Sequence, residues 1–188
     1  MRRDLTFIAK TSVLFCALSA AFSFVGIFLA QKGPLGNPLP AFTIEEIGGH
    51  FLWGLAAGAL TLSLRYTLVA GAFAVLIDSD HLIGLTPLDA IPRMSHYILC
   101  GVIALVILVL LFGKKDWRLG AVAFAAVLSH ISFDIFAGDP WFPFLTPFYN
   151  NQLTFTSIDW LYFEVAAVTI VGVAAIIARK KELKKLAA

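Results

Sequence analysis

All four histidines of the chain lie at or near the ends of long apolar segments, and three of them stand beside other residues that commonly form sites. The histidines are His50, His81, His96 and His130. The three neighbouring sequences are Asp78-Ser79-Asp80-His81, Arg93-Met94-Ser95-His96 and His130-Ile131-Ser132-Phe133-Asp134. Imidazole and carboxylate groups are costly near an apolar bilayer core, and a divalent metal ion compensates several of them at once. These residue types therefore predict a metal site.

Helical spacing places two pairs of these residues on common faces. His130 and Asp134 are four residues apart in a strongly apolar segment, so both side chains can bind one ion. Asp78 and His81 are three residues apart and share a face in the same way. Asp80 points in another direction unless the helix has unwound at that position. A glycine and a proline shortly after it predict that this helix ends there.

Each pattern alone has an ordinary structural explanation, because a single histidine at a helix end is commonly an interfacial or capping residue. Their combination at one membrane level, with no histidine elsewhere, predicts six metal ligands: His50, Asp78, His81, His96, His130 and Asp134. Imidazole and carboxylate ligands without a thiolate suit zinc, with manganese and iron as alternatives. A set of this size fits two ions about 3.5–4 Å apart better than a structural zinc site.

The composition is that of a membrane protein. Of the 188 residues, 60% are hydrophobic and 14% are charged, whereas a soluble domain carries roughly 25% charged residues. The mean hydropathy is +0.87. The net charge of +2 does not by itself bear on nucleic acid, and we expect no nucleic-acid partner. Cys16 and Cys100 lie far apart in apolar runs without metal-ligand spacing, so we expect small core residues.

We expect an all-α, polytopic membrane helix bundle of about six transmembrane helices, forming one domain over residues 1–188. The segments are residues 5–30, 47–64, 67–82, 95–112, 119–136 and 158–178. The second and third are short for a span of about 20 residues, so a tight helical hairpin with its tip at Arg65-Tyr66 is the alternative. The first apolar stretch is longer than the roughly 7–15 residues of a signal peptide. We therefore expect residues 1–32 to be a retained anchor helix.

The basic residues predict the orientation. All but two of the 14 lysines and arginines fall near the N-terminus, in the second-to-third and fourth-to-fifth connections, or in the tail that follows the last helix within residues 158–188. Only Lys32 and Arg93 fall on the opposite side. The positive-inside rule then places both termini in the cytoplasm and the protein in the cytoplasmic (inner or plasma) membrane. The histidine-bearing ends and residues 31–46, 83–94 and 137–157 face outward.

The ordered motifs resemble those of the YdjM-like inner-membrane metal-dependent hydrolases, also called the DUF457 type or LexA-binding membrane hydrolases. The shared pattern is a histidine opening a helix, an Asp-x-Asp-His block, an arginine three residues before a histidine, a His-x-x-x-Asp pair and a loop rich in glycine and proline. This chain supplies His50, residues 78–81, residues 93–96, His130 with Asp134, and a loop from Gly138 through Pro143 to Pro147. The resemblance covers residues 45–150. It implies a metal-dependent hydrolase core there, and a looser similarity to zinc phospholipase C and P1-type nucleases suggests phosphoester chemistry.

The expected reaction is hydrolysis by a metal-activated water at the outer membrane surface. Arg93, a lone cation beside an acidic cluster, suits a catalytic and substrate-binding role on a phosphate or another anion. Its alternative is an interfacial residue or an ion pair with Asp89. Asp80 is expected to be a ligand or the general base. Ser95 fits a helix cap or a donor to a ligand better than a nucleophile.

The aromatic loop at residues 138–149 suits the membrane interface, and Trp141 and Phe144 are the residues expected to contact an apolar substrate. A lipid with a polar head is therefore the expected substrate class, with membrane lipid and small molecules as partners. Glu164 is either a supporting partner of a histidine or a separate buried acid. The oligomeric state is left open.

Two other functions are compatible with part of the pattern. Intramembrane histidines and aspartates also mark ion pathways, so a metal-ion or proton-coupled transporter is the alternative. A transporter commonly places its site near the bilayer midplane between repeats, whereas these ligands lie toward one face and no repeat is visible. A membrane scaffold without catalysis is a third possibility, and it leaves the histidine clustering unexplained.

Overall fold

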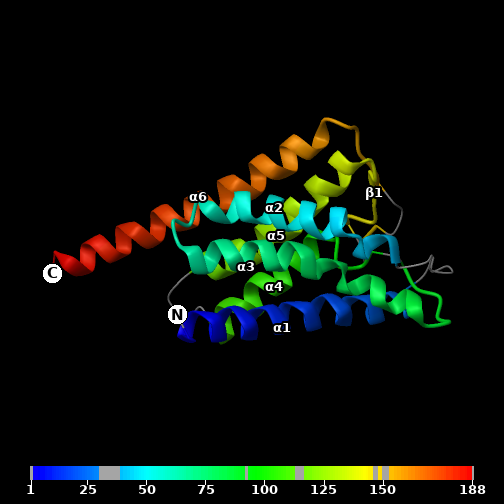
Figure 1. Cartoon of the computed structure of the whole chain (residues 1–188), viewed down its shortest axis with the longest axis horizontal. Helices are drawn as coiled ribbons and strands as arrows, with labels where there is room; N and C mark the ends of the chain where they lie inside the picture. The colour runs from blue at the N-terminus through cyan, green and yellow to red at the C-terminus, as the bar shows by residue number, and fades with distance from the viewer. Residues whose placement is uncertain are drawn as a thin grey trace.

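Six α-helices run roughly along one direction and form a bundle in the computed structural model (Figure 1). They are α1 (Arg2–Gly26), α2 (Ile44–Ala59), α3 (Leu64–Leu76), α4 (Ile98–Leu111), α5 (Arg118–Ala137) and α6 (Asp159–Leu186). The structure describes residues 2–29, 39–91, 93–112, 117–145, 148–149 and 153–187. Lys32, Pro92, Lys114, Lys115 and Pro147 therefore lie outside the described residues.

Four of these helices are long and apolar enough to cross a membrane. They are α1, α5, α6 and the continuous helical stretch Leu64–Leu85, in which α3 is extended by the 3-10 helix η2 (Ile77–Leu85). Within the described residues, α2 has 16 residues and α4 has 14, so both are shorter than these four. The helical bundle is thus confirmed, with four helices that could cross a membrane, while the count of six spans stays a prediction.

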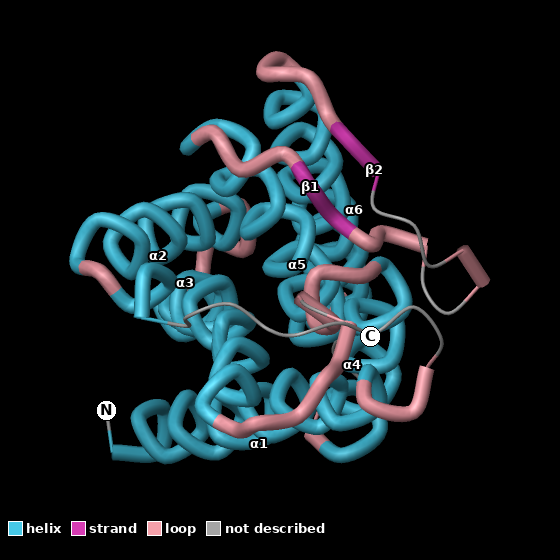
Figure 2. Tube along the Cα trace, turned by 90° about the vertical axis from the view of Figure 1, so that its right-hand side faces the viewer, coloured by secondary structure: helices cyan, strands magenta, loops and turns pink. Residues whose placement is uncertain are grey.

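The fold departs from all-α in one small element. Strands β1 (Trp141–Phe142) and β2 (Leu153–Thr154) pair antiparallel, with Trp141 opposite Thr154. In the end view of Figure 2 this pair lies beside α5 and α6, on the side of the bundle opposite α1. A short 3-10 helix, η1 (Leu39–Phe42), precedes α2.

Helix α5 is the centre of the bundle. Nearly all of its side chains between Leu119 and Ile135 are buried, and it packs against α2, α3, α4 and α6. Small residues permit the close approach. A Cβ atom on Gly120 would lie 2.5 Å from Val109 of α4, too close for an ordinary contact. Because α5 touches four helices, the two predicted ligands that it carries can meet groups from several segments.

Helices α2 and α3 form an antiparallel hairpin. Added Cβ atoms on Gly54 and Gly58 would each lie 2.5 Å from atoms of Ala70, so these glycines let the two backbones meet within one chain. The connection consists of residues 60–63. The predicted tip at Arg65-Tyr66 is therefore wrong, since both residues lie in the first turn of α3.

Both termini lie at the same end of the bundle, and β1 lies at the other (Figure 1). Their shared position agrees with the predicted topology, while the side of the membrane that each end faces stays a prediction. The exposed Ser157 precedes α6, and the exposed Lys184 lies near its C-terminal end.

Accessibility labelling tests the orientation. In a background with Cys16→Ala and Cys100→Ala, Ser157→Cys should react with an impermeant maleimide on intact cells, because the loop before α6 faces outward. Lys184→Cys should react only after the membrane is opened and serves as the control. The reverse pattern would place the histidine-bearing end in the cytoplasm and overturn the predicted orientation.

Candidate metal centre

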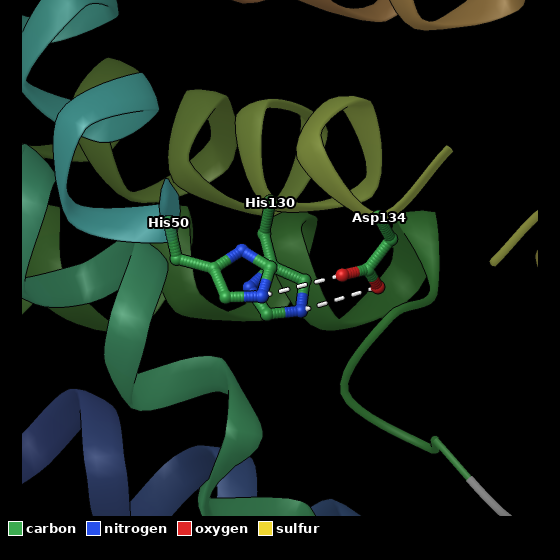
Figure 3. A group of neighbouring side chains, drawn as sticks. All are labelled: His50, His130 and Asp134. Carbon is green, nitrogen blue, oxygen red and sulfur yellow. Dashed lines mark ion pairs between the residues drawn. The ribbon is translucent and has the colours of Figure 1, made fainter. Parts of the chain in front are cut away.

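The structure brings together all six predicted ligands at the bundle end that is remote from the termini. His50 comes from α2, and His130 and Asp134 come from α5. Residues 78–81 lie in η2, and His96 lies in the loop before α4. All are buried except His81, whose side chain is 26% exposed. Figure 3 shows the stacked imidazoles of His50 and His130 with Asp134 beside them.

Two local features explain how η2 and the following loop deliver their groups. The chain changes from α-helix to the more tightly wound 3-10 helix at Ile77, so the expected unwinding near Asp80 does not occur and the helix instead continues through Leu85. In a 3-10 helix residues three apart lie in line, which keeps Asp78 and His81 on one side. His96 was expected at the start of the fourth helix, but α4 begins at Ile98. His96 lies instead in a turn, and its backbone N–H donates to the Arg93 carbonyl at 3.1 Å.

The imidazoles of His96 and His130 face each other through their Nε2 atoms, which are 2.8 Å apart. His130 Nδ1 lies 2.6 Å from the Ala74 carbonyl oxygen, and His96 Nδ1 lies 3.2 Å from Asp80 Oδ2. Both partners only accept hydrogen bonds, so each Nδ1 donates and each neutral ring keeps a lone pair on Nε2. Two facing lone pairs are satisfied only by a proton or a metal ion between them.

Carboxylate oxygens complete this group. Asp78 Oδ1 lies 3.4 Å from His130 Nε2, and Asp134 Oδ2 lies 3.5 Å from Nε2 of both His96 and His130. His50 Nε2 lies 3.2 Å from Asp134 Oδ1 and 3.5 Å from Asp78 Oδ2. Imidazole nitrogens and carboxylate oxygens directed at one point form a donor set that fits zinc, manganese or iron.

A second group of possible ligands shares Asp78 with the first. His81 Nε2 lies 3.5 Å from Asp78 Oδ1 and 3.7 Å from Asp80 Oδ1. Asp80 Oδ1 is buried and has no hydrogen-bond partner among the described residues. Ligand atoms of Asp78, Asp80 and His81 lie within 4.8 Å of one another, as do those of His50, His130 and Asp134 and those of Asp78, His96 and His130. The ligand groups therefore overlap and could hold metal ions, with Asp78 belonging to two of them.

Ser95 supports these ligands from the side. Its backbone N–H and its hydroxyl both donate to Asp80 Oδ2, at 3.0 and 2.6 Å. The same carboxylate oxygen accepts from His96 Nδ1. Ser95 thus orients the aspartate that orients His96, which is the supporting position predicted for it. Its hydroxyl is fully buried, so an attacking role is excluded by this geometry.

An open cavity of about 280 Å³ leads from the surface to the ligands. His50, Asp78, His81 and Asp134 form part of its wall, whereas the buried Asp80, His96 and His130 do not line it. The other lining residues are Ala41, Glu46, Arg93, Ala137, Gly138 and Asp139. The charged lining residues are mostly acidic, and Arg93 is the lone guanidinium among them.

Arg93 bridges the centre and its rim. Its guanidinium forms an ion pair with Asp134 and a second one with Asp139 Oδ2 at 2.6 Å, and it stacks 4.4 Å above the ring of Phe142. The backbone is left-handed there, with φ of 58°, a conformation that is costly for a side chain other than glycine. The alternative pairing with Asp89 is not the one formed.

The guanidinium of Arg93 stays protonated and positively charged. Burial of the guanidinium lowers its pKa, but the carboxylates of Asp134 and Asp139 outweigh burial and hold the pKa above its ordinary value. Glu46 behaves differently. Burial, together with the nearby charges of Asp134 and Asp78, raises the pKa of its carboxyl group. The cavity is thus lined by a guanidinium that stays charged and by a carboxyl group whose pKa is raised.

The aromatic residues named from the sequence do not line the cavity. Trp141 is 51% exposed and Phe144 packs against Phe155 and Phe163. The neighbour of Trp141, Phe142, is fully buried and lies against both His96 and Arg93. Substrate contacts by Trp141 and Phe144 stay predictions that this geometry does not favour.

Glu164 was predicted to be either a supporting partner of a histidine or a separate buried acid, and the structure favours the second role. Its Oε2 accepts a hydrogen bond from Ser129 Oγ at 2.9 Å, and its Oε1 is buried without a hydrogen-bond partner among the described residues. Ser129 directly precedes His130 on α5, yet its hydroxyl points to α6 rather than to the ligands. Glu164 is therefore a half-buried acid that is separate from the ligands.

Sequence reasoning missed Glu46 and Asp139 as parts of the site. Glu46 Oε2 lies 3.6 Å from His50 Nε2, four residues along the same helix. This four-residue spacing is visible in the sequence and could have indicated that Glu46 lies beside His50. Asp139 follows Gly138, which ends α5 in a left-handed conformation. Nothing in the spacing of Asp139 indicates that the chain turns it toward Arg93.

No family model, curated protein or solved structure matches this chain. The resemblance to the YdjM-like hydrolases therefore stays a prediction that rests on the motifs alone.

Proposed function

We propose that this chain is a membrane-embedded metal-dependent hydrolase of the YdjM-like type, which acts at the outer membrane surface on a phosphoester or lipid substrate. The observation that carries the proposal is the facing pair of Nε2 atoms of His96 and His130, joined by oxygens of Asp78 and Asp134. This centre lines part of an open cavity with a guanidinium on its wall. A purely structural site would be closed to solvent and substrate.

Zinc, or manganese or iron, bound by these residues would supply Lewis acidity and an activated water near neutral pH. The protein groups divide the remaining work. Arg93 is placed to hold an anionic oxygen of the substrate, because its fork of donors matches phosphate. Asp80 is buried, does not line the cavity and is bound by Ser95 and His96. We therefore assign it to ligation and to the orientation of His96, in place of the general-base role.

The cavity supports the proposed substrate class. Its polar lining suits a headgroup or a small phosphoester rather than an acyl chain, and its volume of about 280 Å³ admits a small group. Large apolar side chains are exposed close to it in the chain, among them Phe136 and Trp141 at 55% and 51%. Such residues suit a membrane interface, which brings a lipid headgroup to the cavity mouth.

Metal analysis combined with a hydrolysis screen tests the proposal. Purified protein should contain up to two equivalents of metal and should hydrolyse a phospholipid headgroup or a generic phosphodiester. A chelator should abolish the activity, and zinc or manganese should restore it. Asp78→Asn should lose activity because the shared ligand is weakened, while Glu164→Gln, which alters a half-buried acid outside the centre, should retain it. Metal-loaded protein that cleaves none of these esters would contradict the hydrolase assignment and leave the metal centre standing.

A further inference from the structure

Helix α1 is bonded through side chains to η2, the segment that carries two of the six predicted ligands together with Asp80. Ser19 Oγ donates to the Ile77 carbonyl at 2.6 Å, and Ser23 Oγ donates to the Asp80 carbonyl at 2.8 Å. Ser79 Oγ lies 3.1 Å from the Cys16 carbonyl oxygen, but its shorter hydrogen bond, at 2.7 Å, goes to the Leu76 carbonyl of its own preceding turn. Two hydroxyls of α1 therefore join two segments that lie about 60 residues apart in the sequence.

The two serines belong to a buried stripe on an otherwise largely exposed helix. Residues of the stripe are spaced mostly four apart: Thr11, Phe15, Ser19, Ser23 and Gly26. A serine or threonine inside a helix commonly returns its hydrogen bond to a carbonyl of its own preceding turn. Thr11 does so, with the Phe7 carbonyl as acceptor at 2.9 Å. Ser19 and Ser23 instead donate to η2, so their hydroxyls serve the contact between segments.

The same contact extends to the loop that carries Arg93 and His96. The Ile77 carbonyl accepts from Ser19, and the Ser95 hydroxyl lies 3.0 Å from the same carbonyl oxygen. Ser95 donates its hydroxyl proton to Asp80, which in turn accepts from His96. At the end of α1 the Gly26 carbonyl accepts from the Ile91 N–H at 3.2 Å. Helix α1 therefore touches both segments that deliver ligands from outside α2 and α5.

We infer that Ser19 and Ser23 are positioning residues of the metal centre, and that α1 is a part of the centre in addition to being a membrane anchor. This inference rests on the proposed metal centre. The Ile77 and Asp80 carbonyls bracket Asp78, and fixing two backbone points three residues apart fixes the rotation of η2 about its axis. That rotation decides where the carboxylates of Asp78 and Asp80 point. Metal–ligand distances tolerate deviations of only about 0.2 Å, so a loosened η2 binds metal less well.

Three variants on one helix separate this role from general support. Ser19→Ala and Ser23→Ala each remove one hydroxyl bonded to η2. Thr11→Val is the matched control, since it removes an equally buried hydroxyl bonded within α1. Zinc titration and the absorption spectrum of the cobalt-loaded protein measure the centre. Hydrogen exchange of the peptide covering residues 77–85, recorded in chelator, measures η2 without any metal.

Each serine variant should weaken zinc binding about 10–100-fold, the usual effect of losing a group that orients a ligand. It should also alter the cobalt spectrum and speed hydrogen exchange in η2, while Thr11→Val changes none of these. Equal zinc affinity and equal exchange in all variants would overturn the inference, and so would the same losses in Thr11→Val. Wild-type protein that binds neither zinc nor cobalt would instead refute the proposed metal centre itself.

Discussion

His130→Ala should lose the ion held beside His96 and His130 and keep at most one ion, at Asp78, Asp80 and His81, whereas His81→Ala should keep the ion beside His130. His130 Nε2 belongs to two of the three overlapping ligand groups, and His81 belongs to one. Losing even a partner outside the ligand set costs about 10–100-fold in metal affinity, so losing a shared ligand should cost more than about 100-fold. Metal content by elemental analysis, together with zinc titration of chelator-stripped protein, measures both effects.

Ser129→Ala is the control for this experiment. It alters the neighbouring residue on the same buried turn of α5, but the Ser129 hydroxyl binds Glu164 and no ligand. Its metal content should equal that of the wild type. His130→Gln preserves more side-chain volume than alanine and should also lose metal, which separates ligand loss from a packing defect. Full, chelator-sensitive occupancy in His130→Ala and His130→Gln would remove His130 from the centre.

Contacts within one segment were predictable from the sequence. The four-residue spacing of His130 and Asp134 placed both on one face of α5, and the structure puts Asp134 Oδ2 3.5 Å from His130 Nε2. Apolar length located the start of each helix within three residues, but α6 continues to Leu186, beyond the predicted end at residue 178. Both inferences depend only on helical periodicity, which one sequence contains in full.

The convergence of ligands from several segments was predicted, but which ligands contact one another was not. The Asp78 bridge between ligand groups depends on how α2, α3, α5 and η2 pack, and no local pattern encodes that arrangement. Helix α1 was placed outside the core of residues 45–150, because its serines look like ordinary small residues in an apolar span. Their hydrogen bonds to η2 can be identified only in the folded structure, where η2 packs beside α1.

The sequence did not indicate which aromatic residue of the loop contacts the metal centre. Trp141 and Phe142 are adjacent in a two-residue strand, and neighbouring side chains in a strand point to opposite faces. The sequence indicated an aromatic contact in this loop but not which face of the strand meets the centre. The structure buries Phe142 and exposes Trp141, so the expected contact shifts by one residue.

Arg93→Ala should retain its metal and lose most of its hydrolytic activity. A guanidinium has only donors and cannot ligate metal, while its place on the cavity wall suits an anion that develops charge during the reaction. Losing one such contact typically lowers kcat/KM about 10²–10³-fold. Arg93→Lys should recover only part of the loss, because an ammonium group cannot reproduce the bidentate fork.

Asp139→Asn separates binding of substrate from anchoring of the loop. Asp139 is paired with Arg93 but is itself 61% exposed, so its substitution weakens the pair and leaves the guanidinium in place. If Arg93 serves mainly to anchor its loop, Asp139→Asn should reproduce much of the Arg93→Ala defect. If Arg93 meets the substrate, Asp139→Asn should keep most of the activity.

The same variants distinguish a hydrolase from a metal transporter. In a transporter Arg93 repels the transported cation or lies beside its path, so Arg93→Ala should leave metal flux unchanged or faster. Metal uptake into proteoliposomes, measured beside phospholipid and phosphodiester hydrolysis for wild type and all three variants, compares the two functions directly. Chelator-sensitive flux without cleavage of any ester would replace the hydrolase by a transporter. Ester cleavage that falls with Arg93→Ala at constant metal content would assign Arg93 to the substrate.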